Sequence, residues 1–261
     1  MKVRQALSIA LDRSAVINAG EYGEQPAAQS PTGLVLPLQS SQLAPGAAAE
    51  NYTAPNLTQA RSLLESAGFT YSNGHLYEPG GKPFSLTVIA PSAFTDIMAD
   101  FQVVANQWDA LGASVTLDGE SVPSWLQQSE TGDYQVSFGG GASPETVDPW
   151  GSYNELLNSA LAGPIGQPSV GDPEHFVSPQ ADALLAQWAN ATTDTARQQA
   201  EDGIENIMVS QVPAIPLFYN VLFSEWTTTQ VTGWPTASDE YEVPSPLGEQ
   251  AEVVALHLTA S

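Results

Sequence analysis

The sequence has no cysteine and very little positive charge. Its 261 residues contain six lysines and arginines against 29 aspartates and glutamates, which gives a formal net charge of −23. Without cysteine, disulfides, thiolate metal sites and cysteine nucleophiles are all excluded. Because no Lys or Arg lies between Lys82 and Arg197 or after Arg197, no basic patch is available to neutralise phosphates. We therefore expect no nucleic-acid partner and repulsion from an anionic membrane surface.

Long hydrophobic runs are also missing. The longest nearly apolar stretch, 212–223, contains two prolines and an asparagine and is too short to span a bilayer. Hydrophobic residues nevertheless make up 42% of the chain and aromatic residues 8%, which is too much for a disordered protein. The length suggests one large domain or two small ones. The sequence begins in a helix-like segment and shows no apolar signal segment. We therefore expect that the chain is either cytosolic or that its N-terminal part has been removed.

Apolar periodicity predicts alternating strands and helices in the middle of the chain. The β-α-β-α-β order favours a mostly parallel sheet covered by helices. Whether Asp12 and Arg13 break the first helix stays open, and residues 21–50 are expected to be a long irregular segment with a function. Asn56, Ser178 and Asp194 are the expected N-caps. The predicted helices are 2–17, 56–68, 94–111, 124–128, 153–161, 179–190 and 195–210, the predicted strands 86–90, 113–117, 134–138 and 212–223, and 227–258 is expected to mix strand and loop.

Residues 132–150, GDYQVSFGGGASPETVDPW, form the most informative stretch. Alternating Tyr134, Val136 and Phe138 predict a strand that ends at the glycine triplet 139–141. Glycines allow another molecule to approach closely, and ligands of open α/β sheets usually bind beyond the carboxyl ends of strands. We therefore predict a ligand-facing loop, with a plain loop as the alternative.

Catalytic motifs are absent from the sequence. The three histidines are far apart, and no HExxH, GxSxG, SxxK or P-loop pattern occurs. Asp172, Glu174 and His175 could hold a metal, but GDPEHF is more typical of a turn. Glu145 and Asp148 could form the carboxylate pair of a glycoside hydrolase, whereas a single acid that binds an amine or a sugar hydroxyl explains the same residues. We expect neither an enzyme nor a cofactor.

Several motifs together resemble one protein family. The segment VRQALSIALDRSAVI at 3–17 is similar to a helix of bacterial extracellular solute-binding proteins of family 5, the peptide, nickel and oligosaccharide receptors of ABC importers. Each motif is weak alone, but their order over almost the whole chain is specific. The later motifs are ARSLLESAGF at 60–69, GKPFSLTVIAP at 81–91, QWDALGASVTL at 107–117, TGDYQVSFGG at 131–140, VDPW at 147–150, ADALLAQW at 181–188, VPAIPLFYN at 212–220 and VTGWP at 231–235.

The resemblance implies a fold, a role and a location. Family members are about twice as long, and the VRQAL helix lies in their second half. The implied fold is one α/β lobe of a type II periplasmic binding protein, with lobe II at 1–211, a hinge crossing and C-terminal return segment at 212–261, and lobe I missing. The implied role is capture of a small molecule outside the cell, in the periplasm or on a lipid anchor at the outer face of the cell membrane. The implied partners are ABC permease subunits and lobe I of the same protein.

The resemblance leaves two ligand classes open. In peptide-binding relatives an aspartate shortly before the DP pair holds the ligand's amino group, and Glu145 stands nearest to that position. The ending VTGWPTASDEY resembles the form found in oligosaccharide receptors of the family, and aromatic side chains of this chain could stack on sugar rings, although a core role is the alternative. The candidate ligand-binding residues are Gly140, Glu145, Asp148, Trp125, Trp150 and Tyr153.

Overall fold

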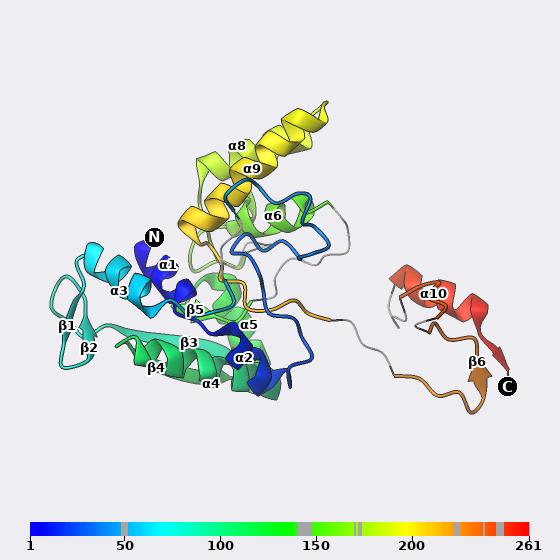
Figure 1. Cartoon of the computed structure of the whole chain (residues 1–261), viewed down its shortest axis with the longest axis horizontal. Helices are drawn as coiled ribbons and strands as arrows, with labels where there is room; N and C mark the ends of the chain where they lie inside the picture. Colours follow the sequence, from blue (N-terminus) through cyan, green and yellow to red (C-terminus); the bar gives the residue numbers. More distant parts are fainter. Residues whose placement is uncertain are drawn as a thin grey trace. The chain divides into compact units, whose positions relative to one another are not determined.

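The computed structural model describes residues 1–47, 52–139, 148–169, 171, 174–221, 225–236, 238–243 and 248–260. The chain divides into two compact units, Met1–Tyr219 and Asn220–Ser261. The larger unit contains a three-stranded parallel sheet and the helices α1 to α9 (Figure 1). None of the helices in the described ranges is both long and apolar enough to cross a bilayer.

The sheet confirms the predicted strand order. Strand β3 (Ser85–Pro91) lies between β4 (Ser114–Glu120) and β5 (Val136–Ser137), and both neighbours run parallel to it. Val88 and Ala90 of β3 are fully buried and Ile89 nearly so, as expected for a strand that is covered on both faces. Strand β5 is shorter than the predicted 134–138.

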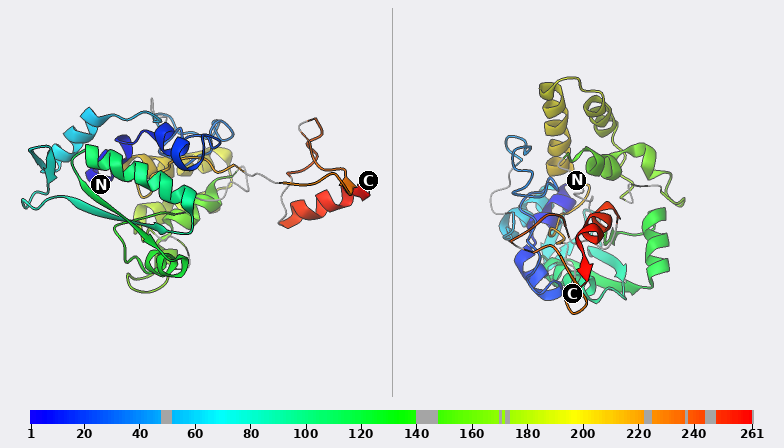
Figure 2. Two further views of the ribbon diagram at one scale, coloured as in Figure 1. Left: turned by 90° about the horizontal axis from the view of Figure 1, so that it is seen from below. Right: turned by 90° about the vertical axis from the view of Figure 1, so that its right-hand side faces the viewer.

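Helices pack against this sheet and against one another. Helix α4 runs along β3 and β4 (Figure 2), and its buried residues Phe101, Val104 and Trp108 recur every three or four positions. The Trp108 indole N–H donates to the Leu7 carbonyl at 3.0 Å, which ties α4 to α1. The helices of this group are α1 (Lys2–Ile9), α2 (Arg13–Gly20), α3 (Leu57–Ser66), α4 (Thr95–Ala110) and α5 (Val122–Thr131).

Side-chain caps decide where two of these helices begin. The Asp12 carboxylate accepts from the Ala15 N–H at 3.0 Å, so the predicted helix 2–17 is broken and a second helix starts at Arg13. The Asn56 side chain accepts from the Gln59 N–H at 3.0 Å, as predicted. Helix α3 is followed by a hairpin of β1 (Thr70–Ser72) and β2 (His75–Tyr77), whose strands are too short to show a periodic signal.

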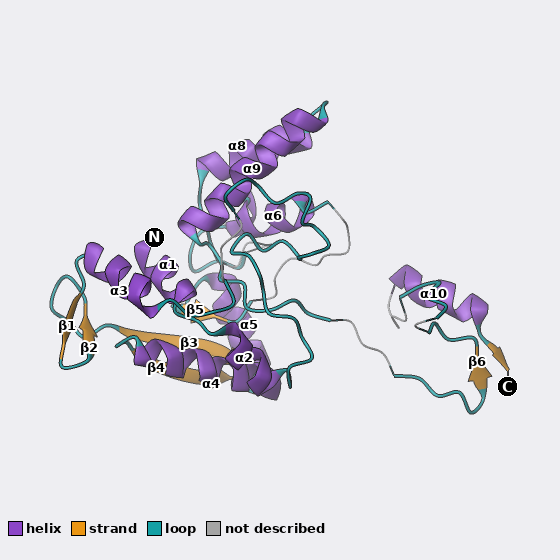
Figure 3. Cartoon of the chain, in the orientation of Figure 1, coloured by secondary structure: helices purple, strands orange, loops and turns teal. Residues whose placement is uncertain are grey.

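A second hydrophobic cluster lies among α6, α8 and α9, which form a group of their own in Figure 3. Ser178 caps α8 as predicted, with its hydroxyl accepting from the Ala181 N–H. Helix α9 is capped by Thr193, which accepts from the Ala196 N–H, so the predicted cap Asp194 is instead the first helical residue. The elements are α6 (Trp150–Leu157), α7 (Ser159–Ala162), α8 (Pro179–Ala189) and α9 (Asp194–Gln211).

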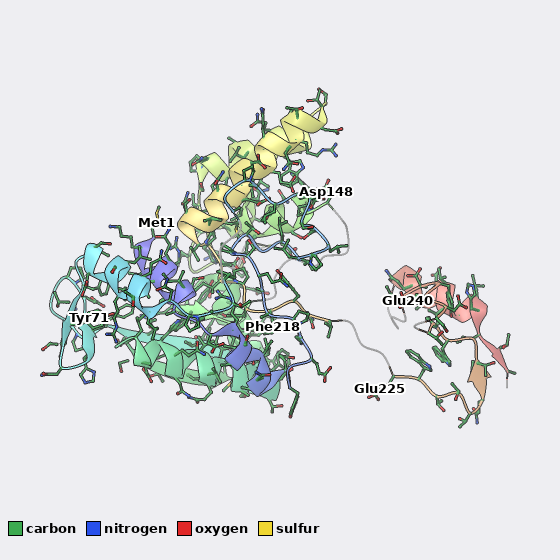
Figure 4. All side chains as sticks on the ribbon, in the orientation of Figure 1. Met1, Tyr71, Asp148, Phe218, Glu225 and Glu240 are labelled. Carbon is green, nitrogen blue, oxygen red and sulfur yellow. The ribbon has the colours of Figure 1, made fainter. Side chains whose placement is uncertain are left out.

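The strand predicted at 212–223 is wrong for its described part, 212–221. Val212 has a left-handed backbone (φ 48°), residues 213–214 form a bend, and a single isolated bridge in this described part joins Phe218, which is labelled in Figure 4, to Ala27. Two backbone hydrogen bonds hold it, from Ala28 N–H to the Leu217 carbonyl and from Tyr219 N–H to the Pro26 carbonyl. The prolines of this segment remove ladder donors. Residues 212–219 thus belong by contact to the larger unit, and the lobe boundary at 211 remains a prediction.

The smaller unit pairs β6 (Val231–Thr232) antiparallel with β7 (Thr259–Ala260) and contains helix α10 (Gly248–His257). The prediction of only strand and loop at 227–258 is therefore wrong at α10. Trp226 stacks on Trp234 with ring centroids 5.7 Å apart, and Tyr241 stacks on His257 at 4.0 Å. Aromatic pairs thus supply much of the packing of this unit.

Candidate functional site

Three aromatic side chains meet at the carboxyl edge of the parallel sheet. Phe94 follows β3, Phe138 follows β5, and Trp125 lies on α5, which begins directly after β4. Helix α5 begins there because the Ser121 hydroxyl accepts from the Ser124 N–H at 3.3 Å. Because the carboxyl ends of parallel strands share one edge, residues distant in sequence come together there. We call Phe94, Trp125 and Phe138 the aromatic shelf.

The aromatic shelf packs against the core through Phe101 and remains partly exposed to solvent. The Trp125 ring lies 6.5 Å from Phe94 and 6.0 Å from Phe138, and Phe138 packs edge-on against Phe101 at 6.1 Å. The Trp125 indole N–H donates to the Ser137 hydroxyl at 3.1 Å. Phe94 is 40% exposed, and the other two members are half-buried. A preoriented, partly exposed aromatic surface is suited to stacking or apolar contact with a small ligand.

Polar groups surround the shelf. The hydroxyls of Ser129 and Ser137 lie 2.7 Å apart. The half-buried Glu120 carboxylate accepts from the Ser124 hydroxyl at 2.7 Å, and hydrogen bonds from Ser124 and then Gln128 lower the pKa of Glu120. The edge therefore combines apolar area with hydroxyl and carboxylate groups, a combination found in small-molecule binding surfaces.

The predicted ligand loop is only partly visible. Gly140 and Glu145 lie outside the described residues, so their assignment stays a prediction. Asp148 is exposed at the start of α6 (Figure 4), where its carboxylate accepts from the Trp150 N–H at 3.0 Å. The Trp150 indole N–H donates to the Leu185 carbonyl at 3.1 Å. Asp148 thus accepts from the first N–H of α6, and Trp150 is a partly buried packing residue of the second cluster.

Tyr153 is a core residue in this structure. It is 3% exposed, its hydroxyl donates to the Thr32 carbonyl at 3.0 Å, and its ring lies 6.1 Å from Trp188. Burial, followed by the charges of Glu205 and Glu201, raises the pKa of Tyr153. These contacts favour the alternative of a core role over sugar stacking.

The three predicted aromatics do not share one surface. Trp125 contacts side chains of the first cluster, whereas Trp150 and Tyr153 belong to the second. Trp125 therefore remains our candidate for ligand contact, and Tyr153 leaves the candidate set because it presents almost no area to a ligand.

The metal candidates gain no support from the geometry. Asp172 lies outside the described residues. The His175 ring nitrogens lie 3.1 Å from the Glu130 carbonyl and 3.4 Å from the Gly163 carbonyl. Within the described ranges, no three His, Asp or Glu side chains are arranged to hold a metal ion.

Two kinds of residue at these sites are not predicted from the sequence. The apolar pattern places Phe94 in a helix and Phe138 in a strand, and their position at the end of a strand is the available signal for a ligand surface. Buried acids were missed because only apolar residues were expected in the helix stripes. Glu201 and Glu205 nonetheless occupy the same three- and four-residue spacing as Ile204, and that pattern could have located them.

A helix-flanked parallel sheet with aromatic side chains beyond its strands is the arrangement expected of one lobe of a solute-binding protein. The sequence profile described as "Bacterial extracellular solute-binding proteins, family 5 Middle" matches residues 1–163. The chain belongs to this family, which is one of binding proteins rather than enzymes. The recognition made from the motifs is thereby confirmed.

Known relatives show how much of such a protein the chain represents. It is 24% identical over 235 residues to the periplasmic oligopeptide-binding protein OppA of Salmonella typhimurium, covering 85% of this chain and 37% of OppA. The mannohexaose-bound periplasmic oligopeptide-binding protein of Thermotoga maritima superposes with a TM-score of 0.83 at 19% identity, covering 100% of this chain and 49% of that one. For AppA of Bacillus subtilis in complex with a nonapeptide the TM-score is 0.66 at 21% identity, covering 92% and 46%.

These similarities confirm the predicted fold class. The chain has the α/β fold of a type II periplasmic binding protein, with a parallel sheet and flanking helices, and it spans about half of the solved chains, 49% for the Thermotoga protein.

Proposed function

We propose that this chain is part of the substrate-binding component of an ABC importer. The component would capture an oligopeptide or a similar small solute outside the cell and deliver it to the membrane permease. The observation that carries the proposal is the aromatic shelf at the carboxyl edge of the sheet, in a chain that belongs to family 5. That edge is where open α/β sheets bind their ligands.

The proposal includes the organisation of the whole receptor. Residues 1–211 would form lobe II, and residues 212–261 would cross the hinge and pack on lobe I of the same protein. The receptor would work in the periplasm or on a lipid anchor at the outer face of the membrane, and two of its relatives are named as periplasmic proteins. Closure of two lobes would enclose the ligand and exclude water, so one lobe alone would bind it weakly.

An oligosaccharide is the second candidate ligand, and the shelf itself supports it. Phe94 and Trp125 present partly exposed aromatic area beside hydroxyl groups, a combination suited to the apolar faces and hydroxyls of sugars. The first candidate, an oligopeptide, is supported by the sequence similarity to OppA. The class of protein is the same in both cases.

Two measurements test the proposal. Native mass spectrometry of the two-lobed protein, purified from its own host, should show a peptide or a sugar that leaves with it. Calorimetry with that ligand should then show at least tenfold weaker binding for Trp125→Ala, about 1.4 kcal/mol. Gln127→Ala, an exposed position on the same helix, should bind as the natural protein does. If Trp125→Ala binds the ligand as tightly as Gln127→Ala does, Trp125 does not belong to the site. Turnover of a peptide or glycoside by the protein would overturn the receptor assignment.

A further inference from the structure

Helix α9 carries two carboxylic acids inside the second hydrophobic cluster. Glu201 is 4% exposed and Glu205 is fully buried. Being four residues apart, they lie one turn from each other on the same face of the helix, and buried Ile204 and Met208 share this stripe. Acids at such positions are rarely found without a partner.

The hydrogen bonds of the pair are incomplete. One oxygen of Glu205 accepts from the Ala44 N–H at 2.9 Å, which links α9 to the irregular segment before residue 48. The second oxygen of Glu205 and the Oε1 atom of Glu201 are buried without a hydrogen-bond partner among the described residues. An ionised carboxylate in that position is strongly disfavoured, whereas a protonated carboxyl needs fewer partners. Burial accordingly raises the pKa of Glu201 and of Glu205 to about 7.

The surrounding charges reinforce this effect. Asp148, at the start of α6, and Asp202, on α9 itself, raise the pKa of Glu201 further, and Arg197 lowers it as the smallest contribution. For Glu205 the Ala44 N–H lowers the pKa, while the charges of Glu201 and Asp202 raise it. From α6 the Tyr153 hydroxyl faces both acids, and their charges raise its pKa.

Among the described residues, Glu201 and Glu205 have further neighbours whose charges do not contribute to these pKa shifts. Helix α8 packs on α9 with Ala181, Leu185 and Trp188. The segment 30–47 contributes backbone groups, the Ala44 N–H and the Gln42 carbonyl that accepts from Gln198. Ionisation of both acids would therefore place two like charges one turn apart in a poorly solvated place.

We propose that Glu201 and Glu205 form a proton-operated clasp between α9 and segment 30–47. With protons bound, the clasp holds the segment on the helix. When the pair ionises, the acids move toward water, the Ala44 hydrogen bond breaks, and the segment separates from α9. The Tyr153 bond to the Thr32 carbonyl belongs to the same contact. The charge of Asp148, near the end of the stretch 132–150, acts on Glu201. The clasp does not depend on the identity of the ligand.

Hydrogen exchange of the 261-residue chain tests the clasp. Peptides covering 33–47 are followed at pH 5.5 and pH 8.0, with rates corrected for intrinsic exchange and with β3 as the internal reference. The structure predicts at least tenfold less protection of this segment at pH 8.0, because each acid binds its proton more tightly in the folded state than in the opened one. The double variant Glu201→Gln, Glu205→Gln should keep its protection at both pH values.

The control variant is Glu65→Gln, which removes one negative charge from the exposed surface of α3 and should behave as the natural chain does. The clasp is overturned if the double variant loses as much protection between pH 5.5 and pH 8.0 as the natural chain does, or if the natural chain loses none. Carboxyl ¹³C NMR titration of the natural chain gives a second test that needs no variant. Titration of both acids below pH 5 would also refute the proposal.

Discussion

Replacement of Arg13 should destabilise the larger unit strongly. Arg13 is fully buried and its guanidinium donates to three backbone carbonyls, those of Pro216 at 2.8 Å, Tyr52 at 2.8 Å and Ser8 at 3.2 Å. Its Cζ atom also lies 3.6 Å from the Tyr52 ring centroid. One side chain therefore joins the first helices, the segment at Tyr52 and the segment 212–219.

The magnitude follows from these contacts. Hydrogen bonds from a charged donor contribute about 1.5–3 kcal/mol each. Arg13→Met removes all of them and leaves the three carbonyls without this donor, while methionine recovers part of the lost packing and avoids the desolvation of a buried cation. We expect a net loss of about 4 kcal/mol. For a unit of this size, that corresponds to a fall in melting temperature of about 8–16 °C.

The assay is urea unfolding followed by circular dichroism, with the m-value checked for each variant. Arg4→Met is the matched control. Arg4 also donates to backbone carbonyls, those of Gln211 and Val212, but it is exposed, so its loss should amount to about 1 kcal/mol. A loss below about 1 kcal/mol for Arg13→Met, or equal losses for the two variants, would refute the role assigned to Arg13.

Three further predictions concern pH, ligand and metal. Asp100 is fully buried beside the Gly20 N–H at 3.1 Å, and burial, followed by the charge of Glu21, raises its pKa to about 7. A folded-state pKa above the unfolded value makes the free energy of unfolding fall as pH rises from about 4 to about 7. In urea unfolding, the natural chain should therefore lose about 2 kcal/mol of stability between pH 5 and pH 8 that Asp100→Asn keeps. Parallel pH profiles of the two proteins would contradict this. In the two-lobed receptor, Glu145→Ala and Trp150→Ala should each weaken ligand binding at least tenfold in calorimetry, and unchanged affinity in both would remove the loop from the cleft. Chelators should leave the melting temperature unchanged, and tightly bound zinc whose removal lowers it would show a missed metal site.

Helices and strands were predicted well where the sequence carries both a clear apolar periodicity and a capping or turn residue. The caps at Asn56 and Ser178 are correct because a side chain and an N–H three residues away decide them. The strands at 86–90 and 113–117 and the helix at 94–111 were each found with their boundaries displaced by one to three residues. The missed hairpin and α10 lie in segments where a short element or a weak apolar pattern gave no periodicity to read.

The arrangement of the candidate site depends on information of a different kind. From the sequence, Trp125, Trp150 and Tyr153 are equally good candidates for stacking on a ligand. In the structure, Trp125 lies on the aromatic shelf, whereas the Tyr153 hydroxyl is hydrogen-bonded to Thr32 in the core. Which of them faces solvent depends on chain segments far away in sequence. No local pattern carries that information.

By itself, the sequence determined the family, the β-α-β-α-β order of the central sheet and the absence of cysteine chemistry, because motifs, periodicity and caps act within a few residues. Only the tertiary structure decided that Phe94 and Phe138 join Trp125 at one edge of the sheet. It also decided that Glu201 and Glu205 are removed from water. Solvent exposure and pKa depend on every segment that packs around a side chain, so they are properties of the folded chain.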